Sequence, residues 1–405
     1  MKRPYQLTAG LPPGPLQETL TAFIPLLSSR GYSSYAVDEK RRLLIQFDQW
    51  LLKRRVRLED LNEGHFQQFL QHRCNERRNR GSDGLTLRSL IGALRDQEII
   101  PPPLIRSGGS LSDRLLASFD QYLSDERGLT SATRSWYLYE TRRFISESLR
   151  DGQVSLKDLC AKDITRFMLA RAGSGGAQRT ATALRSFLGF LFSRGDIDIE
   201  LSAALPRVAH RRSGDLPKYL LPEEVERLLK ACKGNTASGR RNHAIVLLLA
   251  RLGLRAGEIV QMTLDDVDWD SGELSIRGKG GRCDRLPLPH DAGEALAAYL
   301  REVRPACESR RVFIRLAAPH QGLAGASSIG FIVRTSLKRA GLNPSIKGAH
   351  LLRHSLATRM VRGGASLGDI GKILRHQLPS TTAIYAKVDS AALRKLVLPW
   401  PGGVA

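Results

Sequence analysis

The chain of 405 residues is poor in acidic residues and has no long apolar run. Its longest apolar stretch, residues 244–250, is far too short to span a bilayer. The first residues, MKRPYQLTAGLPPGPL, carry positive charge but lack the apolar segment of a secretion signal. We therefore expect neither a membrane span nor a secretion signal.

Cysteine is also scarce, and its pattern excludes two classes of small stabilised fold. The five cysteines are scattered and form no C-x-x-C pair: Cys74, Cys160, Cys232, Cys283 and Cys307. An odd, unpatterned set argues against a disulfide framework or a zinc site and fits a reducing cytoplasm. The set of candidate catalytic residues described below includes no cluster of acidic residues that could bind a metal. We expect no metal and no cofactor.

Basic residues, in contrast, are abundant and spread over most of the chain. Lys and Arg number 62 against 40 Asp and Glu, which gives a net charge of +22. Such an excess favours a polyanionic partner, although solubility alone is the simpler alternative. A membrane surface is disfavoured because no helix pattern combines one uniformly basic face with one uniformly apolar face. Double-stranded DNA is the partner we expect.

Two linker-like stretches divide the chain. Residues 99–113, IIPPPLIRSGGSLSD, combine prolines with glycines, and residues 205–220 are bounded by proline and strongly basic. The predicted organisation is an N-terminal helical domain at 1–100, a second helical domain at 111–203, a linker at 204–215 and a third domain at 216–400.

The first two regions resemble each other. SSRGYSSYAVDEKRRLLIQFDQWL (28–51) parallels DERGLTSATRSWYLYETRRFISESL (125–149), and LRSLIGAL (87–94) parallels LRSFLGFL (184–191). The starting positions differ by 97 residues in both pairs, so duplication is a better explanation than chance. Both copies have the apolar periodicity of helical bundles. For the second copy we expect DNA contacts from arginines that lie beside apolar stripes, with these candidates: Arg134, Arg142, Arg179 and Arg185.

The third region has a different character. LPEEVERLLKAC and RRNHAIVLLLARLGL predict helices, whereas GELSIRGKGGRCDRLPLP alternates around a glycine-rich turn and predicts a β-hairpin. GAHLLRHSLATRMVRGG and ASLGDIGKILRH predict two more helices, the second with a capping box. We therefore expect a mainly α fold with a small β-sheet in this domain.

Six residues of this region form a chemically coherent set: Arg255, Lys279, His350, Arg353, His376 and Tyr385. Any one of them alone is more simply explained as a surface or structural side chain. Together, two guanidinium groups would hold the oxygens of one phosphodiester and stabilise its pentavalent transition state. A tyrosine oxygen would attack phosphorus, and imidazole and lysine would transfer protons.

The order of GLRAGE, a hairpin lysine, HLLRH and RHQLPSTTAIYAKV resembles the tyrosine recombinase (phage integrase) family. The spacings from Arg353 to His376 and from His376 to Tyr385 are similar to those of bacterial Xer-type members. The resemblance implies SAM-like helical core-binding bundles and an α+β catalytic domain. It also implies that Tyr385 is the nucleophile and that Arg255 and Arg353 clamp the phosphate.

For the remaining positions, the resemblance makes Lys279 the general acid and gives His350 and His376 assisting roles. Glu258 matches an acidic residue of the family that braces the site, although a surface carboxylate is the alternative. The sequence departs from the family at Arg375, where glycine is usual; this arginine either alters local packing or contacts a phosphate. Residues 1–100 are an addition to the shortest members of the family.

The resulting hypothesis is a site-specific recombinase that rejoins DNA through a covalent 3'-phosphotyrosine, for the integration, excision or transposition of a mobile element. The resemblance implies a homotetramer on paired DNA sites, with or without companion recombinases, in the nucleoid of a bacterial cytoplasm. The apolar residues after Tyr385 would then dock on a neighbouring protomer: Ala391, Leu393, Leu396 and Leu398. Two alternatives stay open, a type IB-like DNA topoisomerase and a catalytically silent DNA-binding protein.

Overall fold

The computed structural model describes seven segments of the chain: residues 12–75, 82–100, 111–148, 156–172, 176–206, 217–278 and 283–388. Contacts separate it into two compact units, one formed by Pro101–Gly214 and the other by Met1–Ile100 together with Asp215–Ala405. The separation of 1–100 and 216–400 into two domains stays a prediction. No helix of the described segments is both long and apolar enough to cross a membrane.

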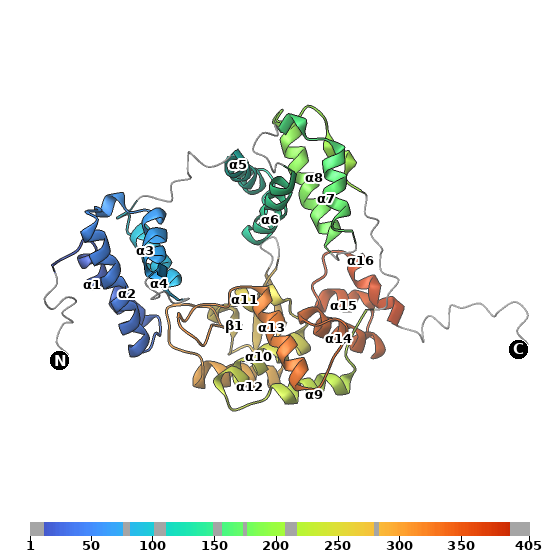
Figure 1. The fold of residues 1–405 in the computed structure, drawn as a ribbon. Helices are drawn as coiled ribbons and strands as arrows, with labels where there is room; N and C mark the ends of the chain where they lie inside the picture. Colours follow the sequence, from blue (N-terminus) through green and yellow to red (C-terminus); the bar gives the residue numbers. More distant parts are fainter. Residues whose placement is uncertain are drawn as a thin grey trace, which may run out of the picture. The chain divides into compact units, whose positions relative to one another are not determined.

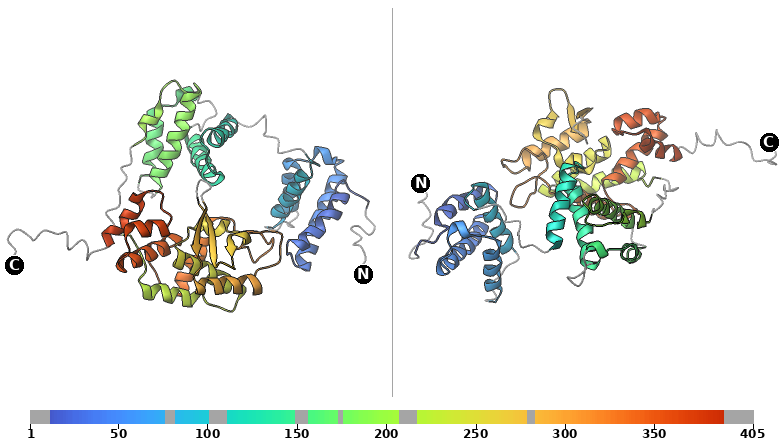
Figure 2. Two further views of the ribbon diagram at one scale, coloured as in Figure 1. Left: turned by 180° about the vertical axis from the view of Figure 1, so that it is seen from behind. Right: turned by 90° about the horizontal axis from the view of Figure 1, so that it is seen from above.

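The first helical group is drawn in blue in Figure 1 and Figure 2. It consists of α1 (Gln17–Ser29), α2 (Ser34–Lys53), a 3-10 turn (Leu58–Asp60), α3 (Glu63–Asn75) and α4 (Asp83–Asp96). Aromatic rings fill its core: the ring centroid of Phe47 lies 4.9 Å from those of both Phe66 and Phe69. This burial, together with aliphatic residues of α1 and α4, holds the four helices together.

The second helical group, Pro101–Gly214, repeats this order of elements. It consists of α5 (Leu111–Asp125), α6 (Ser131–Ser148), a 3-10 turn (Leu156–Asp158), α7 (Ala161–Leu169), α8 (Ala177–Ser193) and a further 3-10 turn (Leu201–Ala204). Phe144 is buried where the alignment predicts the counterpart of Phe47, and Leu184 where it predicts that of Leu87. The two groups therefore share element order and core positions, while their common origin stays a prediction.

The third region begins with helices around a small sheet. The helices are α9 (Pro222–Cys232), α10 (Ala237–Leu252), α11 (Ala256–Gln261), α12 (His290–Glu302) and α13 (Ala326–Arg339). The strands β1 (Val267–Asp268), β2 (Glu273–Arg277) and β3 (Cys283–Pro287) form an antiparallel sheet in the order β1-β2-β3, with Ser275 opposite Arg285. The predicted hairpin is thus confirmed, as is the mainly α fold. Helix α10 is the centre of the core, because its residues 244–250 are all buried.

The last helices, drawn in red in Figure 1, carry most of the candidate site. They are α14 (Ala349–Arg362), α15 (Leu367–Ile373), α16 (Pro379–Thr382) and a terminal 3-10 turn (Ala383–Val388). Ser366 caps α15 by accepting a hydrogen bond from the Asp369 backbone N–H at 3.1 Å, as the sequence predicted. Aliphatic residues of α14 and α15 form a small core around the ring of Tyr385.

Candidate active site

Arg255 and Glu258 define the first corner of the site, at the start of α11. Helix α10 ends at Gly253, whose φ of 58° is a left-handed conformation that favours glycine and turns the chain sharply. Glu258 then accepts hydrogen bonds from the backbone N–H of Arg255 at 2.7 Å and from its guanidinium at 2.8 Å. Glu258 is only 8% exposed, so it fixes Arg255 from inside the fold.

Arg353, on α14, is 3% exposed and lies at the centre of the cluster. Its guanidinium donates to the backbone carbonyl of Gly253 at 2.6 Å and to that of Leu374. Burial, together with the nearby charges of Arg255 and Arg375, lowers the pKa of Arg353 to about 10. The group is still cationic at neutral pH. It therefore links the α10–α11 turn to the end of α15.

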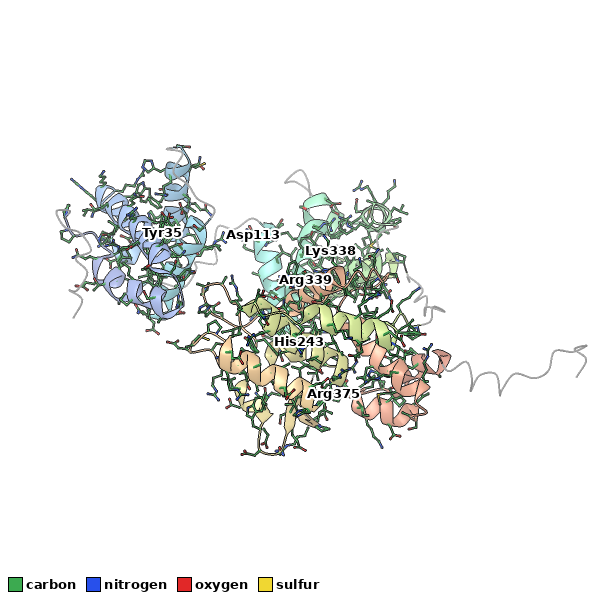
Figure 3. All side chains as sticks on the ribbon, turned by 90° about the horizontal axis from the view of Figure 1, so that it is seen from below. Tyr35, Asp113, His243, Lys338, Arg339 and Arg375 are labelled. Atoms are coloured by element: carbon green, nitrogen blue, oxygen red, sulfur yellow. The ribbon has the colours of Figure 1, made fainter. Side chains whose placement is uncertain are left out.

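Arg375, labelled in Figure 3, is the departure from the family pattern, and its side chain is buried against that of Glu258. The guanidinium donates to Glu258 at 2.8 Å, and both side chains are 6% exposed. Its backbone carbonyl accepts a hydrogen bond from the guanidinium of Arg255 at 3.1 Å. The carbonyl and the guanidinium of Arg375 thus both hold the Arg255–Glu258 pair in place.

The cluster carries more positive than negative charge. The guanidinium groups of Arg255 and Arg375 contact the single carboxylate of Glu258, and the guanidinium of Arg353 lies near enough to feel its charge. Burial acts to raise the pKa of Glu258, but the charge of Arg375 and the hydrogen bonds from Arg255 outweigh it, so its pKa lies below the usual value. Glu258 is thus ionised, and it neutralises only one of three cations. The remaining excess favours binding of an anion.

His376 and Tyr385 lie beside this cation cluster. Burial lowers the pKa of His376 to about 4, reinforced by Arg353, Arg255 and Arg375, so its ring is neutral at physiological pH. Its Nδ1 lies 2.7 Å from the hydroxyl of Thr382. The ring is nearly parallel to that of Tyr385, with centroids 6.4 Å apart.

Tyr385 is buried in the small core, with 1% of its surface exposed. Burial raises the pKa of its hydroxyl to about 12, and the charge of Arg353 acts in the opposite direction. The phenol is therefore protonated at neutral pH. Its ring packs in the small core, and its hydroxyl lies in the polar cluster.

His354 is the site residue that the sequence reasoning missed. Its Nδ1 lies 2.8 Å from the hydroxyl oxygen of Tyr385, and the two ring centroids are 5.6 Å apart. The residue ends the quoted motif HLLRH and lies four positions after His350, on the same face of α14. That spacing was the available signal, because it places a second imidazole next to Arg353.

His350 and Lys279 complete the predicted set. His350 is an exposed residue near the start of α14, and its ring centroid lies 6.3 Å from that of His354. Partial burial, with the charges of Arg353 and Arg255, lowers its pKa. Lys279 lies outside the described residues, in the stretch of sequence between β2 and β3. The structure therefore brings five of the six predicted side chains together with Glu258.

The candidate DNA-contacting arginines of the second helical group lie on α6 and α8. Arg134 is engaged internally, by Asp120 at 2.9 Å and Ser124 at 2.6 Å. Arg142 is 68% exposed, and its nearest carboxylate, that of Asp113, is 4.0 Å away. Arg179 and Arg185 on α8 are exposed, and the Arg179 guanidinium lies 5.9 Å from the centroid of the Trp136 ring.

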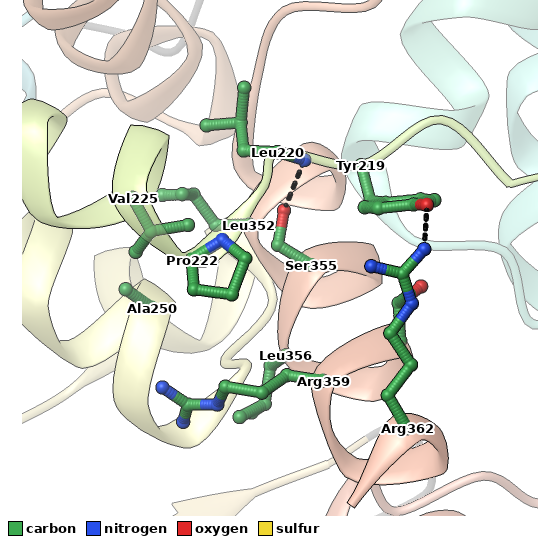
Figure 4. A pocket seen from close by; sticks show the side chains of 11 residues that line it. Tyr219, Leu220, Pro222, Val225, Ala250, Leu352, Ser355, Leu356, Arg359 and Arg362 are labelled. Atoms are coloured by element: carbon green, nitrogen blue, oxygen red, sulfur yellow. Dashed lines mark hydrogen bonds between the residues drawn. The ribbon is translucent and has the colours of Figure 1, made fainter.

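A separate apolar pocket lies between α9, α10 and another side of α14 (Figure 4). Its volume is about 90 Å³, and its walls include Val225, Ala250 and Leu356. The Ser355 hydroxyl accepts a hydrogen bond from the Leu220 backbone N–H at 2.8 Å across its edge. None of the predicted catalytic residues lines this pocket, so the polar cluster described above is the candidate active site.

Known proteins resemble this chain in both sequence and fold. Residues 218–392 match the phage integrase family. The chain is 42% identical over 395 residues to y4rA of Sinorhizobium fredii, named as an integrase/recombinase, with 96% of each chain covered. It is 31% identical over 305 residues to the tyrosine recombinase XerD of Mycobacterium tuberculosis, covering 71% of this chain and 96% of XerD.

A solved structure agrees at the level of the fold. The XerH site-specific recombinase, bound to its palindromic difH substrate after cleavage, matches with a TM-score of 0.53 and 19% sequence identity. The match covers 69% of this chain and 83% of XerH. Three observations indicate the same family: the order of motifs, the mainly helical fold with its three-stranded sheet, and these relatives. The chain belongs to the phage integrase family and is an enzyme of the tyrosine recombinase type.

Proposed function

We propose that this protein is a site-specific DNA recombinase that cleaves and rejoins strands through a covalent 3'-phosphotyrosine at Tyr385. One observation carries the proposal: four predicted side chains, from the start of α11, from α14 and from the segment after α15, meet beside a buried tyrosine in a cluster with excess positive charge. Arg255, Arg353 and Tyr385 are held there by α11, α14 and the final 3-10 turn. A phosphodiester is an anion whose negative charge increases in the transition state, which suits such a cluster.

The roles of the residues follow from their geometry. Arg255 and Arg353 would bind the two non-bridging oxygens of the scissile phosphate, and each has N–H donors beyond those used within the fold. His350 and His376 flank the cation cluster and would donate to the phosphate or share protons with the reacting oxygens. Glu258 and Arg375 brace Arg255 from inside the protein. Because the charged groups of Glu258 and Arg375 are largely buried, Arg375 acts through Arg255 rather than by contacting DNA directly.

Lys279 would protonate the departing 5'-oxygen, a role that rests on its place in the sequence at the hairpin turn. Cleavage then exchanges one phosphodiester for another, so the energy of the broken bond is retained and rejoining needs no external energy source. The exposed arginines of the second helical group would contact DNA phosphates: Arg142, Arg179 and Arg185. The reaction would take place on paired sites in a homotetramer, at the bacterial nucleoid, with integration or excision of a mobile element as its result.

The proposal is tested with DNA selected by the protein itself. A Tyr385→Phe protein is used to enrich duplexes from a random-sequence pool, and nicked versions of the recovered duplex trap covalent adducts. The wild type is expected to form an adduct with the 3'-end and to exchange strands between two copies of the duplex. Failure to enrich any duplex, or to form an adduct, contradicts the proposal. Relaxation of supercoiled plasmid without strand exchange favours a topoisomerase instead.

A further inference from the structure

We propose that His354 is the general base of strand cleavage: its Nδ1 takes the proton of the Tyr385 hydroxyl as that oxygen attacks phosphorus. This inference rests on the proposed function, since it assumes that Tyr385 is the nucleophile. The observation behind it is the 2.8 Å contact between His354 Nδ1 and the hydroxyl oxygen of Tyr385. That distance lies within the range required for direct proton transfer.

Tyr385 needs a base because it is a poor nucleophile as it stands. Its hydroxyl has a pKa of about 12, so almost no phenolate forms at neutral pH. Among the described residues, His354 is the side chain whose hydrogen bond to this hydroxyl the structure shows. The ring of His376 stacks near the phenol with its Nδ1 directed to Thr382, and His350 contacts the ring of His354. His354 is therefore the imidazole placed to remove the proton.

The protonation states are those that general base catalysis requires. Burial lowers the pKa of His354, as do His350 and Arg353, so its ring is neutral and one nitrogen is free to accept. The phenol of Tyr385 is neutral as well. We assign the hydrogen bond as donated by the phenol to Nδ1, with the remaining imidazole proton on Nε2. Nucleophile and base are thus paired before DNA binds.

The step balances as follows. The phenol oxygen of Tyr385 forms a bond to phosphorus while its proton moves to Nδ1 of His354, which becomes an imidazolium. The bond from phosphorus to the 5'-oxygen breaks, and that oxygen takes a proton from Lys279. Rejoining reverses each transfer: the 5'-hydroxyl returns a proton to Lys279, and His354 returns its proton to the departing phenolate. No oxidant, reductant or further reactant is needed.

Bound DNA would increase the basicity of His354. Among the described residues of the free protein, the charged and titratable groups near its ring are His350 and Arg353 on α14, His376 after α15 and Tyr385 in the final 3-10 turn. The one permanent charge in this set is the cation of Arg353. A phosphodiester held by Arg353 adds a negative charge beside it, which offsets the cation and favours the imidazolium. The base is thus activated by the substrate.

A merely structural role for His354 is the competing explanation, and two substitutions separate the two. In His354→Asn, the side-chain oxygen replaces Nδ1 as a hydrogen-bond acceptor but does not take up a proton near neutral pH. In His354→Ala, both the contact and the base are lost, and a cavity is left next to Tyr385. A matched control is His290→Asn, since the His290 side chain is 90% exposed on α12, where it pairs with Glu294.

The experiment measures the single-turnover rate of adduct formation on the nicked duplex recovered by selection with the full chain. We expect both His354 variants to be about 100-fold slower than wild type at pH 7, with His290→Asn unchanged. The wild-type rate should level off above the pKa of the bound-state imidazole. The His354→Asn rate should continue to rise, about tenfold per pH unit, because it follows the phenolate fraction. Added imidazole should accelerate His354→Ala but not His354→Asn.

A bridging 5'-phosphorothiolate in the same duplex distinguishes the loss of the general base from the loss of the general acid. Its thiolate leaves without a proton, so it should restore cleavage to Lys279→Ala while leaving His354→Asn slow. A wild-type rate in His354→Asn, or restoration of that variant by the phosphorothiolate, overturns the assignment of His354 as the base. An adduct formed by Tyr385→Phe would instead overturn the proposed function, so the two failures are distinguishable.

Discussion

The buried pair of Arg375 and Glu258 gives a prediction whose size follows from the structure. The two side chains are in contact at 2.8 Å and are each only 6% exposed. Removing one partner of such a pair costs about 3–5 kcal/mol, because the other charge is left buried. Glu258 keeps two hydrogen bonds from Arg255 after the change, so we place Arg375→Ala at the lower end, about 3 kcal/mol.

The backbone at Arg375 adds a second effect of opposite sign. Its φ of 55° is left-handed, which is unfavourable for a residue with a Cβ and readily adopted by glycine. Arg375→Gly loses the same ion pair but relieves strain of about 1 kcal/mol. The glycine variant should therefore be destabilised by about 2 kcal/mol, less than the alanine variant, although it removes more of the side chain.

Hydrogen exchange of the full chain, measured on peptides from α11 and α14–α15, reports the local opening free energy. The double variant, Arg375→Ala with Glu258→Gln, should lose less opening free energy than the sum of the losses in the two single variants. The difference should be at least about 1 kcal/mol, because the double variant leaves neither charge buried without its partner. Lys372→Ala is the control, since its side chain is 83% exposed and should change the free energy by less than about 0.5 kcal/mol. Strict additivity, or a glycine variant as unstable as alanine, would refute this reasoning.

Three further predictions concern the frame of the site. Gly253→Ala should destabilise by about 2 kcal/mol or more in thermal unfolding, because a Cβ there meets Leu374 at 2.8 Å in a left-handed backbone. His376 should titrate near pH 4 by NMR, and a midpoint near 6.5 would contradict its burial. Because the pKa of His376 is lower in the folded protein than in the unfolded chain, its contribution to stability is present above pH 6.5 and is lost as the pH falls towards 4. Ser366→Ala should reduce the stability of α15 by about 1 kcal/mol, seen as faster hydrogen exchange in that helix alone.

Much of the fold was predictable because local chemistry determines it. The apolar periodicity of α10 and α14, the cap at Ser366 and the alternation around the β2–β3 turn are all short-range signals. The recurrence of element order in the two helical groups was likewise visible as a repeat at a fixed interval. These patterns depend on residues within a few turns of each other, which a sequence displays directly.

The site was only partly predictable, because its contacts join residues far apart in the chain. The types and order of Arg255, Arg353 and Tyr385 predicted the chemistry proposed above, but nothing local shows that the Arg375 guanidinium turns inward to Glu258, which is 117 positions away. The same holds for the contact of His354 with Tyr385, 31 positions apart. Side-chain direction at such positions depends on tertiary packing, which sequence spacing does not report.

The central claim is that Tyr385 attacks DNA, and the position of the covalent bond tests it most directly. Wild-type protein is incubated with the nicked duplex, digested with protease and nuclease, and its nucleotide-bearing peptide is sequenced by mass spectrometry. We predict one modified residue, Tyr385, joined to a 3'-phosphate, and no adduct in Tyr385→Phe. A nucleotide on any other residue, a 5'-phosphate linkage, or an adduct that persists in Tyr385→Phe would contradict it.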